Sequence, residues 1–122
     1  MRRIVNPAIV AFGLTPTLAV RGRKSGDWRV APVNVLELDG HRYLVAPRGE
    51  TQWVRNLRAA GEGELRRRRE VERFRARELP VEERAQVIDA YVARWGKQVR
   101  SQFEALPDPA DHPVFRIEPL SA

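Results

Sequence analysis

Apolar and polar residues alternate over short stretches in the first half of the chain. Residues 17–21 have β character, and residues 28–38 read as one long strand because β-branched and apolar side chains recur along them. A glycine-containing turn at residues 22–27 joins these two strands. The dipeptide Asp39-Gly40 is preferred in tight hairpins, and residues 41–46 provide the return strand. The pattern predicts an antiparallel meander, which disfavours a Rossmann-type nucleotide site.

A short helix is predicted after the meander, over residues 51–60. Thr51 is suited to cap this helix, and Gly61 is suited to stop it. Trp53 and Leu57 are four residues apart and therefore share one helix face. For a tryptophan on such a face, burial in the core is the more frequent outcome.

Arginine dominates the next two predicted strands, at residues 63–72 and 71–79. The two-residue period of a strand predicts that Phe74 and Ala76 point inward. The arginines that flank them then point outward: Arg73, Arg75 and Arg77. The run at residues 66–69 is expected at the tip of the hairpin.

The clearest helix in the sequence is predicted to begin at Pro80 and to end at Gly96. Two glutamates fall in its first turn, where the helix dipole favours negative charge. The predicted inward stripe is Ala85, Ile88, Val92 and Trp95, with Val87 and Tyr91 on its flank. Residues 97–106 are predicted to form another short helix, and residues 113–117 a last strand.

Five or six antiparallel strands with two or three helices are too many for a chain of 122 residues unless the strands curl into a small barrel. The expected fold class is therefore α+β, mainly β. The length fits one domain, so residues 1–122 are expected to form a single folded unit.

The composition limits the kinds of reaction and metal site that the chain can support. Because the chain has no cysteine, disulfides, thiolate metal sites and cysteine nucleophiles are excluded, and the cytoplasm is the expected compartment. Residues 1–7 resemble the start of a signal peptide, but Asn6-Pro7 interrupts it and the apolar run that follows is short. Residues 4–14 are expected to form a short helix covering one end of the barrel. The alternative is a peripheral contact of residues 1–14 with the inner face of a membrane.

The formal net charge is +6, which favours an anionic partner such as a nucleic acid, a membrane surface or a phosphorylated small molecule. A metal site is disfavoured, because the only histidines, His41 and His112, have no ligand partner at useful spacing. Each is expected to be exposed or packed by a loop. No serine lies in a nucleophile elbow or near a suitable histidine, which disfavours serine hydrolase chemistry.

The segment at residues 22–26 can bind an anion. It offers the cations Arg23 and Lys24, the Ser25 hydroxyl and main-chain N–H groups next to glycines, and Arg29 adds charge from the next strand. An exposed basic hairpin explains the same residues equally well. Residues 46–49 can likewise be read as a binding segment or as an ordinary turn, since a proline and a glycine at a strand end suit the close approach of a planar ligand.

An ordered set of motifs resembles the deazaflavin-dependent nitroreductase family. The set is Asn6-Pro7, Gly22-Arg23-Lys24-Ser25-Gly26, Arg29, Pro32-Val33, Leu44-Val45-Ala46-Pro47-Arg48-Gly49, Trp53 and Asn56-Leu57. The resemblance runs from about residue 6 to residue 79. It implies a split β-barrel that binds coenzyme F420, an 8-hydroxy-5-deazaflavin with a phosphate and a polyglutamate tail. Members of the family pass a hydride from the reduced cofactor to quinones, nitro compounds or other electron-poor acceptors.

The resemblance also implies roles for individual residues. The anionic tail would be contacted by Arg23, Lys24, Ser25, Gly26 and Arg29. Pro32 would border the cofactor, and Trp53 and Asn56 would pack beside it. The deazaflavin and phosphate side would be lined by Ala46, Pro47, Arg48 and Gly49. No catalytic side chain is implied, because hydride transfer belongs to the cofactor.

Two features depart from the family pattern. Only three residues separate Gly49 from Trp53, and one of them, Glu50, brings negative charge beside the expected tail site. The C-terminal region, where some relatives place tyrosines near the acceptor, offers Tyr91. We treat Tyr91 as a substrate-pocket candidate, although core packing is the favoured role for its position.

Two other readings stay open. A split barrel can hold FMN or haem instead, since a fold does not fix its ligand. A nucleic-acid-binding domain would use the arginine strands at residues 66–77, but such binders interleave exposed aromatics with charge, and Phe74 alone is available there. We therefore expect a small-molecule acceptor and no nucleic acid as partner. The oligomeric state cannot be read from the sequence.

Overall fold

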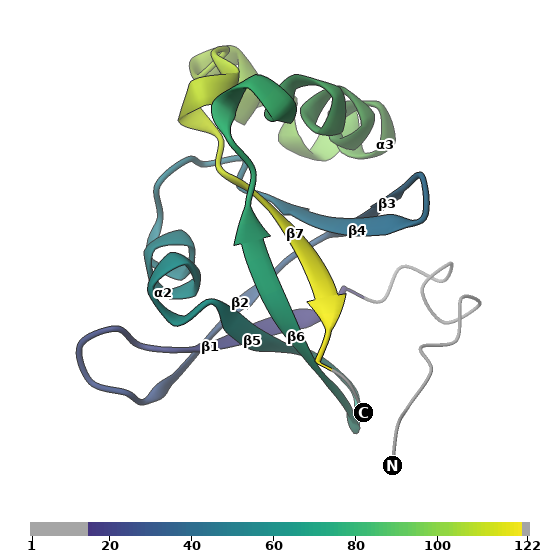
Figure 1. The fold of residues 1–122 in the computed structure, drawn as a ribbon. Coiled ribbons are helices and arrows are strands. Elements are labelled where there is room, and N and C mark those ends of the chain that lie inside the picture. Colours follow the sequence, from purple (N-terminus) through teal and green to yellow (C-terminus); the bar gives the residue numbers. More distant parts are fainter. Residues whose placement is uncertain (1–14, 121–122) are drawn as a thin grey trace.

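The structure is a computed structural model and describes residues 15–120. Within this part, seven strands form one antiparallel sheet in the order β2-β1-β5-β6-β7-β4-β3. The strands are β1 (Thr17–Arg21), β2 (Trp28–Pro32), β3 (Val35–Leu38), β4 (His41–Val45), β5 (Glu62–Arg67), β6 (Glu70–Glu78) and β7 (Val114–Pro119). The helices are α2 (Gln52–Ala60) and α3 (Arg84–Ala105), with single turns η1 (Val81–Glu83) and η2 (Pro109–Asp111). The sheet curls strongly, and α3 lies across one end of it (Figure 1).

The predicted long strand at residues 28–38 is two strands. Pro32 ends β2 because it has no N–H for the ladder. The N–H of Val33 donates instead to the Pro16 carbonyl at 3.1 Å, outside the regular pairing. The chain then starts β3 at the opposite edge of the sheet, since β2 and β3 are the two edge strands. Two strands that follow each other in the sequence, β2 and β3, therefore lie at opposite edges of the sheet.

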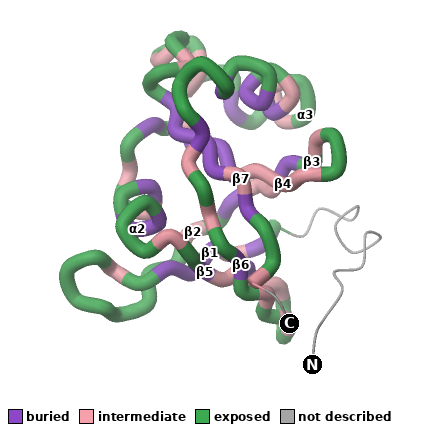
Figure 2. Tube along the Cα trace, viewed as in Figure 1, coloured by how far each residue is buried: buried purple, intermediate pink, exposed green. Residues whose placement is uncertain are grey.

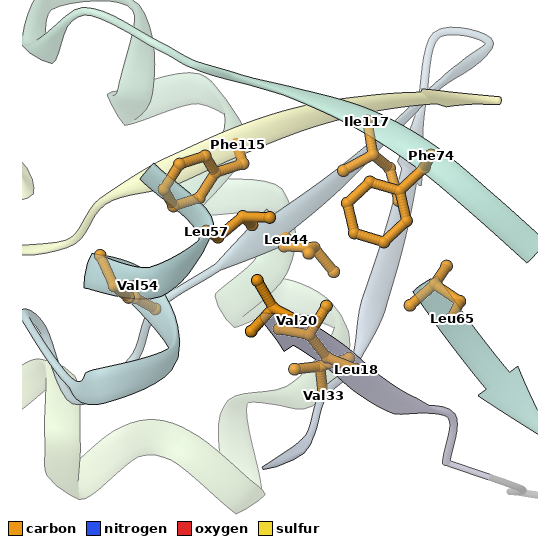
Figure 3. Close-up of a cluster of buried hydrophobic side chains, with 11 residues drawn as sticks. Leu18, Val20, Val33, Leu44, Val54, Leu57, Leu65, Phe74, Phe115 and Ile117 are labelled. Carbon is orange, nitrogen blue, oxygen red and sulfur yellow. The ribbon is translucent and has the colours of Figure 1, made fainter. Parts of the chain in front are cut away.

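One core lies inside the curled sheet, where α2 closes it (Figure 3). Phe74 is fully buried there, as predicted, while the arginines on the opposite face of β6 are exposed. Gly63 sits where β1 and Phe74 approach closely, since a Cβ would lie 2.9 Å from the Ala19 carbonyl oxygen. The cluster consists of Leu18, Val20, Val33, Leu44, Ala46, Val54, Leu57, Leu65, Phe74, Phe115 and Ile117.

A second core lies between α3 and the sheet. Here the predicted helix stripe is wrong at its start, because Ala85 is exposed and Arg84 is buried. The Arg84 guanidinium donates to the carbonyls of Leu79 (3.1 Å) and Ala110 (3.3 Å), so its burial is compensated by hydrogen bonds. Tyr91, placed on the flank by the sequence pattern, is only 2% exposed and belongs to this core.

Helix α3 differs from its predicted bounds, whereas α2 follows them. A three-ten turn follows Pro80, so that α3 itself starts at Arg84. The helix does not end at Gly96: it breaks at Trp95 (φ −119°, ψ 25°) and continues to Ala105, which accounts for the second short helix expected there. The shorter helix α2 ends as predicted at Gly61, whose left-handed φ of 74° lets its N–H donate to the Leu57 carbonyl.

Candidate cofactor site

Two adjoining cavities lie between the β1–β2 hairpin, the start of α2 and the middle of α3. Their volumes are about 800 Å³ and about 470 Å³, and they share Ala31, Thr51 and Trp53. The larger one is further lined by Gly22, Arg23, Lys24, Ser25, Trp28, Arg29, Val30, Gln52 and Asn56. The smaller one is further lined by Thr15, Pro32, Val33, Asn34, Val45, Ala46, Pro47, Arg48, Tyr91, Gln98, Val99 and Gln102.

Most predicted site residues therefore lie on the walls of these two cavities. The basic turn and Arg29 line the larger cavity, whereas Pro32, the strand end at residues 46–48 and Tyr91 line the smaller one. Gly26 and Gly49 line neither. Gly49 instead shapes the turn: its φ is 83°, and a Cβ there would lie 3.0 Å from the Asp111 carbonyl oxygen.

The basic turn is exposed along its tip, as Figure 2 shows for the hairpin beside α2. Its main chain is closed by a hydrogen bond from the Gly22 N–H to the Asp27 carbonyl at 2.7 Å. The Ser25 hydroxyl accepts from the Asp27 N–H at 3.1 Å. Within residues 15–120, neither Lys24 nor Arg29 forms an ion pair, so both are free to meet an anion in the larger cavity.

Arg23 differs from its neighbours because helix α2 holds it. Its Nη1 donates to the Asn56 Oδ1 at 2.8 Å and to the Gln52 Oε1 at 3.0 Å. Its main-chain N–H also donates to the same Asn56 oxygen at 3.1 Å. Asn56 is 4% exposed. Its side-chain oxygen thus fixes the basic turn against the helix.

Glu50, which departed from the family pattern, does not line either cavity. Arg58 donates to both of its carboxylate oxygens, at 3.0 Å and 2.8 Å, and also to Glu78 on β6. These hydrogen bonds with Arg58 lower the pKa of the Glu50 carboxyl. The negative charge is therefore paired with Arg58 and lies outside the lining of both cavities.

Aromatic and amide side chains line the smaller cavity. Trp53 packs on Phe115 with ring centroids 6.2 Å apart. The Asn34 amide donates to the Tyr91 hydroxyl oxygen at 3.3 Å, and burial raises the pKa of that phenol. Tyr91 therefore stays protonated over the physiological range.

Two polar groups that the sequence did not single out lie on the cavity walls. The Thr51 Oγ1 and the Gln102 Oε1 are buried and have no hydrogen-bond partner. Thr51 was noticed only as a helix cap, but its hydroxyl does not cap α2. Gln102 carries no signal in the sequence, because an amide on a helix usually faces solvent. Unpaired buried groups at a cavity fit a ligand that brings its own donors and acceptors.

No three histidine, aspartate or glutamate side chains within residues 15–120 are placed to hold a metal ion. His112 is fully buried and stacks on Phe103 of α3, and His41, the first residue of β4, is half-buried. No helix in the same range is long and apolar enough to cross a membrane. The contact predicted for residues 1–14 lies outside the described residues.

A curled antiparallel sheet of seven strands with flanking helices is a split β-barrel. Solved structures agree on the fold. The heme storage protein HutZ from Vibrio cholerae is 17% identical with a TM-score of 0.70, over 98% of this chain and 93% of that one. A protein of unknown function from Agrobacterium tumefaciens is 22% identical with a TM-score of 0.64. This chain spans 49% of the Agrobacterium protein, which covers 88% of this chain.

The family follows from the sequence as well as the fold. Residues 12–105 match the F420H(2)-dependent quinone reductase family. The structure of an F420-H2 dependent reductase, FDR-A, is 25% identical with a TM-score of 0.63, over 87% of this chain and 95% of that one. No protein with a curated description matches significantly. The chain therefore belongs to the F420H(2)-dependent quinone reductase family: it is an oxidoreductase, and coenzyme F420 is its cofactor. The family match extends past residue 79, where the motif resemblance ended, to the last residue of α3.

Proposed function

We propose that this reductase uses reduced coenzyme F420 to reduce a small electron-poor acceptor, such as a quinone or a nitro compound, in the smaller cavity. The observation that carries the proposal is the joined pair of cavities. One is basic and open at an exposed turn, and the other is aromatic and has unpaired buried polar groups. A polyanionic tail suits the first cavity and a planar ring system suits the second.

Different residues of the chain would hold different parts of the cofactor. Arg23, Lys24 and Arg29 would attract the anionic tail, and Ser25 would donate a hydrogen bond to it. Pro32, Trp53 and the strand end at residues 46–48 would enclose the ring. When bound and reduced, the deazaflavin supplies a hydride, and the protein needs only to bind and orient it.

Tyr91 gives the acceptor its polar contact in this proposal. Its phenol is protonated, and its oxygen already accepts a hydrogen bond from Asn34. No group in residues 15–120 accepts the hydroxyl hydrogen, which can therefore be donated to an acceptor oxygen in the smaller cavity.

The test is a fluorescence titration of the purified protein with F420, FMN and haem at low salt, followed by mixing of the reduced F420 complex with quinones and nitro compounds. We expect micromolar or tighter binding of F420 and oxidation of the bound cofactor by at least one acceptor. Absence of F420 binding at low salt would overturn the proposal, and tight binding of FMN or haem would replace it with the corresponding cofactor.

A substitution pair tests the tail site. Lys24→Ala removes a free cation of the larger cavity, whereas Lys97→Ala removes an exposed lysine of α3 that lines neither cavity. We expect Lys24→Ala to weaken F420 binding at low salt and the deficit to shrink as salt rises, because screening weakens exposed charge interactions. Equal affinity of the two variants at low salt would remove Lys24 from the site.

A further inference from the structure

The turn that lines the smaller cavity is held from behind by the loop before β7. The Ala46 N–H donates to the Pro113 carbonyl at 3.0 Å, and the Gly49 N–H donates to the Ala46 carbonyl at 3.1 Å. The His112 Nδ1 lies 2.8 Å from that same Ala46 oxygen. The two peptide groups that flank Ala46 are thus held by residues 112–113, far away in sequence.

His112 is held as firmly as the carbonyl it faces. It is fully buried, and its ring stacks on Phe103 with centroids 4.2 Å apart and an interplanar angle of 28°. Its other nitrogen, Nε2, lies 2.5 Å from the Leu106 carbonyl oxygen at the end of α3. The imidazole therefore connects the end of α3 to the cavity turn.

A neutral imidazole carries one N–H, so it can donate to only one of these two carbonyls. The contact with Ala46 is buried, whereas the contact with Leu106 is partly buried and within reach of water. Each ring nitrogen faces a carbonyl oxygen to which it can donate, and Nδ1 is the nitrogen that faces the cavity turn.

We propose that His112 is a positioning residue for the cofactor turn: its Nδ1–H fixes the Ala46 carbonyl and so sets the turn at residues 46–49 for ligand binding. The proposal rests on the proposed function only in taking this turn as the wall of the cofactor cavity. His112 does not line either cavity, so it acts on the site through the residues that it contacts, of which Ala46 lines the smaller cavity.

Two amide substitutions separate the two contacts. In His112→Asn the side-chain amide nitrogen can take the place of Nδ1, and in His112→Gln it can take the place of Nε2. We expect the F420 dissociation constant to rise about tenfold in His112→Gln, as for loss of one buried hydrogen bond, and to stay within about threefold of wild type in His112→Asn.

A readout without cofactor comes from amide hydrogen exchange of the apo protein. Exchange at the Gly49 N–H, which donates to Ala46, is expected to be about tenfold faster in His112→Gln than in His112→Asn. Ile88→Ala is the control, because Ile88 lies in the core under α3 and lines neither cavity. It should lower thermal stability without changing exchange at Gly49 relative to other amides.

The outcomes separate the two proposals. If wild type fails to bind F420, the proposed function fails, while the exchange comparison still decides the role of His112. If Asn and Gln variants behave alike in both measurements, or if both follow their thermal stability as Ile88→Ala does, the positioning role is overturned. Restoration of slow Gly49 exchange by Asn alone supports it.

Discussion

At the scale of single residues, one buried oxygen organises the basic turn. The Asn56 Oδ1 accepts from both the main-chain N–H and the guanidinium of Arg23. An apolar residue at this position would leave the Arg23 N–H, which is partly buried, without a partner. Asn56 lines the larger cavity, as expected of a residue beside the cofactor, and its side-chain oxygen also holds Arg23 in place.

Asn56→Leu is expected to lower the free energy of unfolding by about 0.5–1.5 kcal/mol, the usual net contribution of a hydrogen bond, because the Arg23 N–H is only partly buried. Asn56→Asp keeps a side-chain oxygen for Arg23 and should retain most of that stability. Urea unfolding of the two variants beside wild type measures the difference. Equal losses in both variants would show that the hydrogen bonds to Arg23 contribute little.

The buried phenol of Tyr91 is expected to make the stability of the fold depend on pH in the alkaline range. Burial raises the pKa of its phenol above the ordinary value of 10.0, so the unfolded chain loses this proton at lower pH than the folded one. The stability that Tyr91 contributes is fully present below pH 10.0 and is lost as the pH rises through the higher folded value. Tyr91→Phe should flatten this alkaline fall in thermal stability. Tyr43→Phe, a change at a half-buried tyrosine, serves as the control and should leave more of the fall intact.

At the scale of elements, the site depends on a turn with little room. Gly49 and Gly40 share a left-handed conformation, with φ of 83° and 81°. They differ in their surroundings: a Cβ at Gly40 meets nothing within 4 Å, whereas one at Gly49 approaches the Asp111 carbonyl oxygen. The turn at residues 46–49 is therefore constrained by the loop that follows α3 as well as by its own backbone.

Gly40→Ala is expected to cost about 1–2 kcal/mol of stability from left-handed strain alone. Gly49→Ala should cost more than that, because the Asp111 backbone must also move. It should also weaken F420 binding, whereas Gly40→Ala should not. Thermal unfolding and F420 titration of both variants test this, and identical behaviour would mean that the contact with Asp111 relaxes freely.

The elements were predictable where burial follows a simple period. Phe74 points inward because its strand alternates regularly, and Gly61 stops α2 through its left-handed conformation. The helix stripe was misplaced at its start because Arg84 is buried through hydrogen bonds to main-chain carbonyls, which no hydrophobic pattern reveals. The strand break after Pro32 was missed because the apolar residues continue beyond it.

The candidate site was predictable only in part, for similar reasons. The basic turn and the strand end at residues 46–48 form contiguous motifs, so their cavity positions could be expected. Thr51, Asn34 and Gln102 are brought to the cavity by the curl of the sheet and by the course of α3. Single polar residues in separate elements carry no local pattern, and only the fold brings them together.

At the scale of the whole molecule, the inner core joins the sheet to α2 and so supports the larger cavity. Phe74→Ala should lower the free energy of unfolding by about 3–5 kcal/mol, the usual cost of removing a buried phenyl group. Val71→Ala, at an exposed position on the same strand, should change it by about 0.5 kcal/mol or less. Chemical denaturation measures both, and similar losses would contradict the packing described for β6.

The attachment of Arg23 to α2 has a consequence for the thermodynamics of ligand capture. A free arginine gives up side-chain conformational entropy worth up to about 2 kcal/mol when it is immobilised. Arg23 is already immobilised by Gln52 and Asn56 when the chain folds, whereas Lys24 is not. An anion that arrives at the turn therefore meets one cation that is ordered in advance and one that must still be ordered. Calorimetry of anion binding should therefore find that the contact with Arg23 carries a smaller entropic penalty than the contact with Lys24.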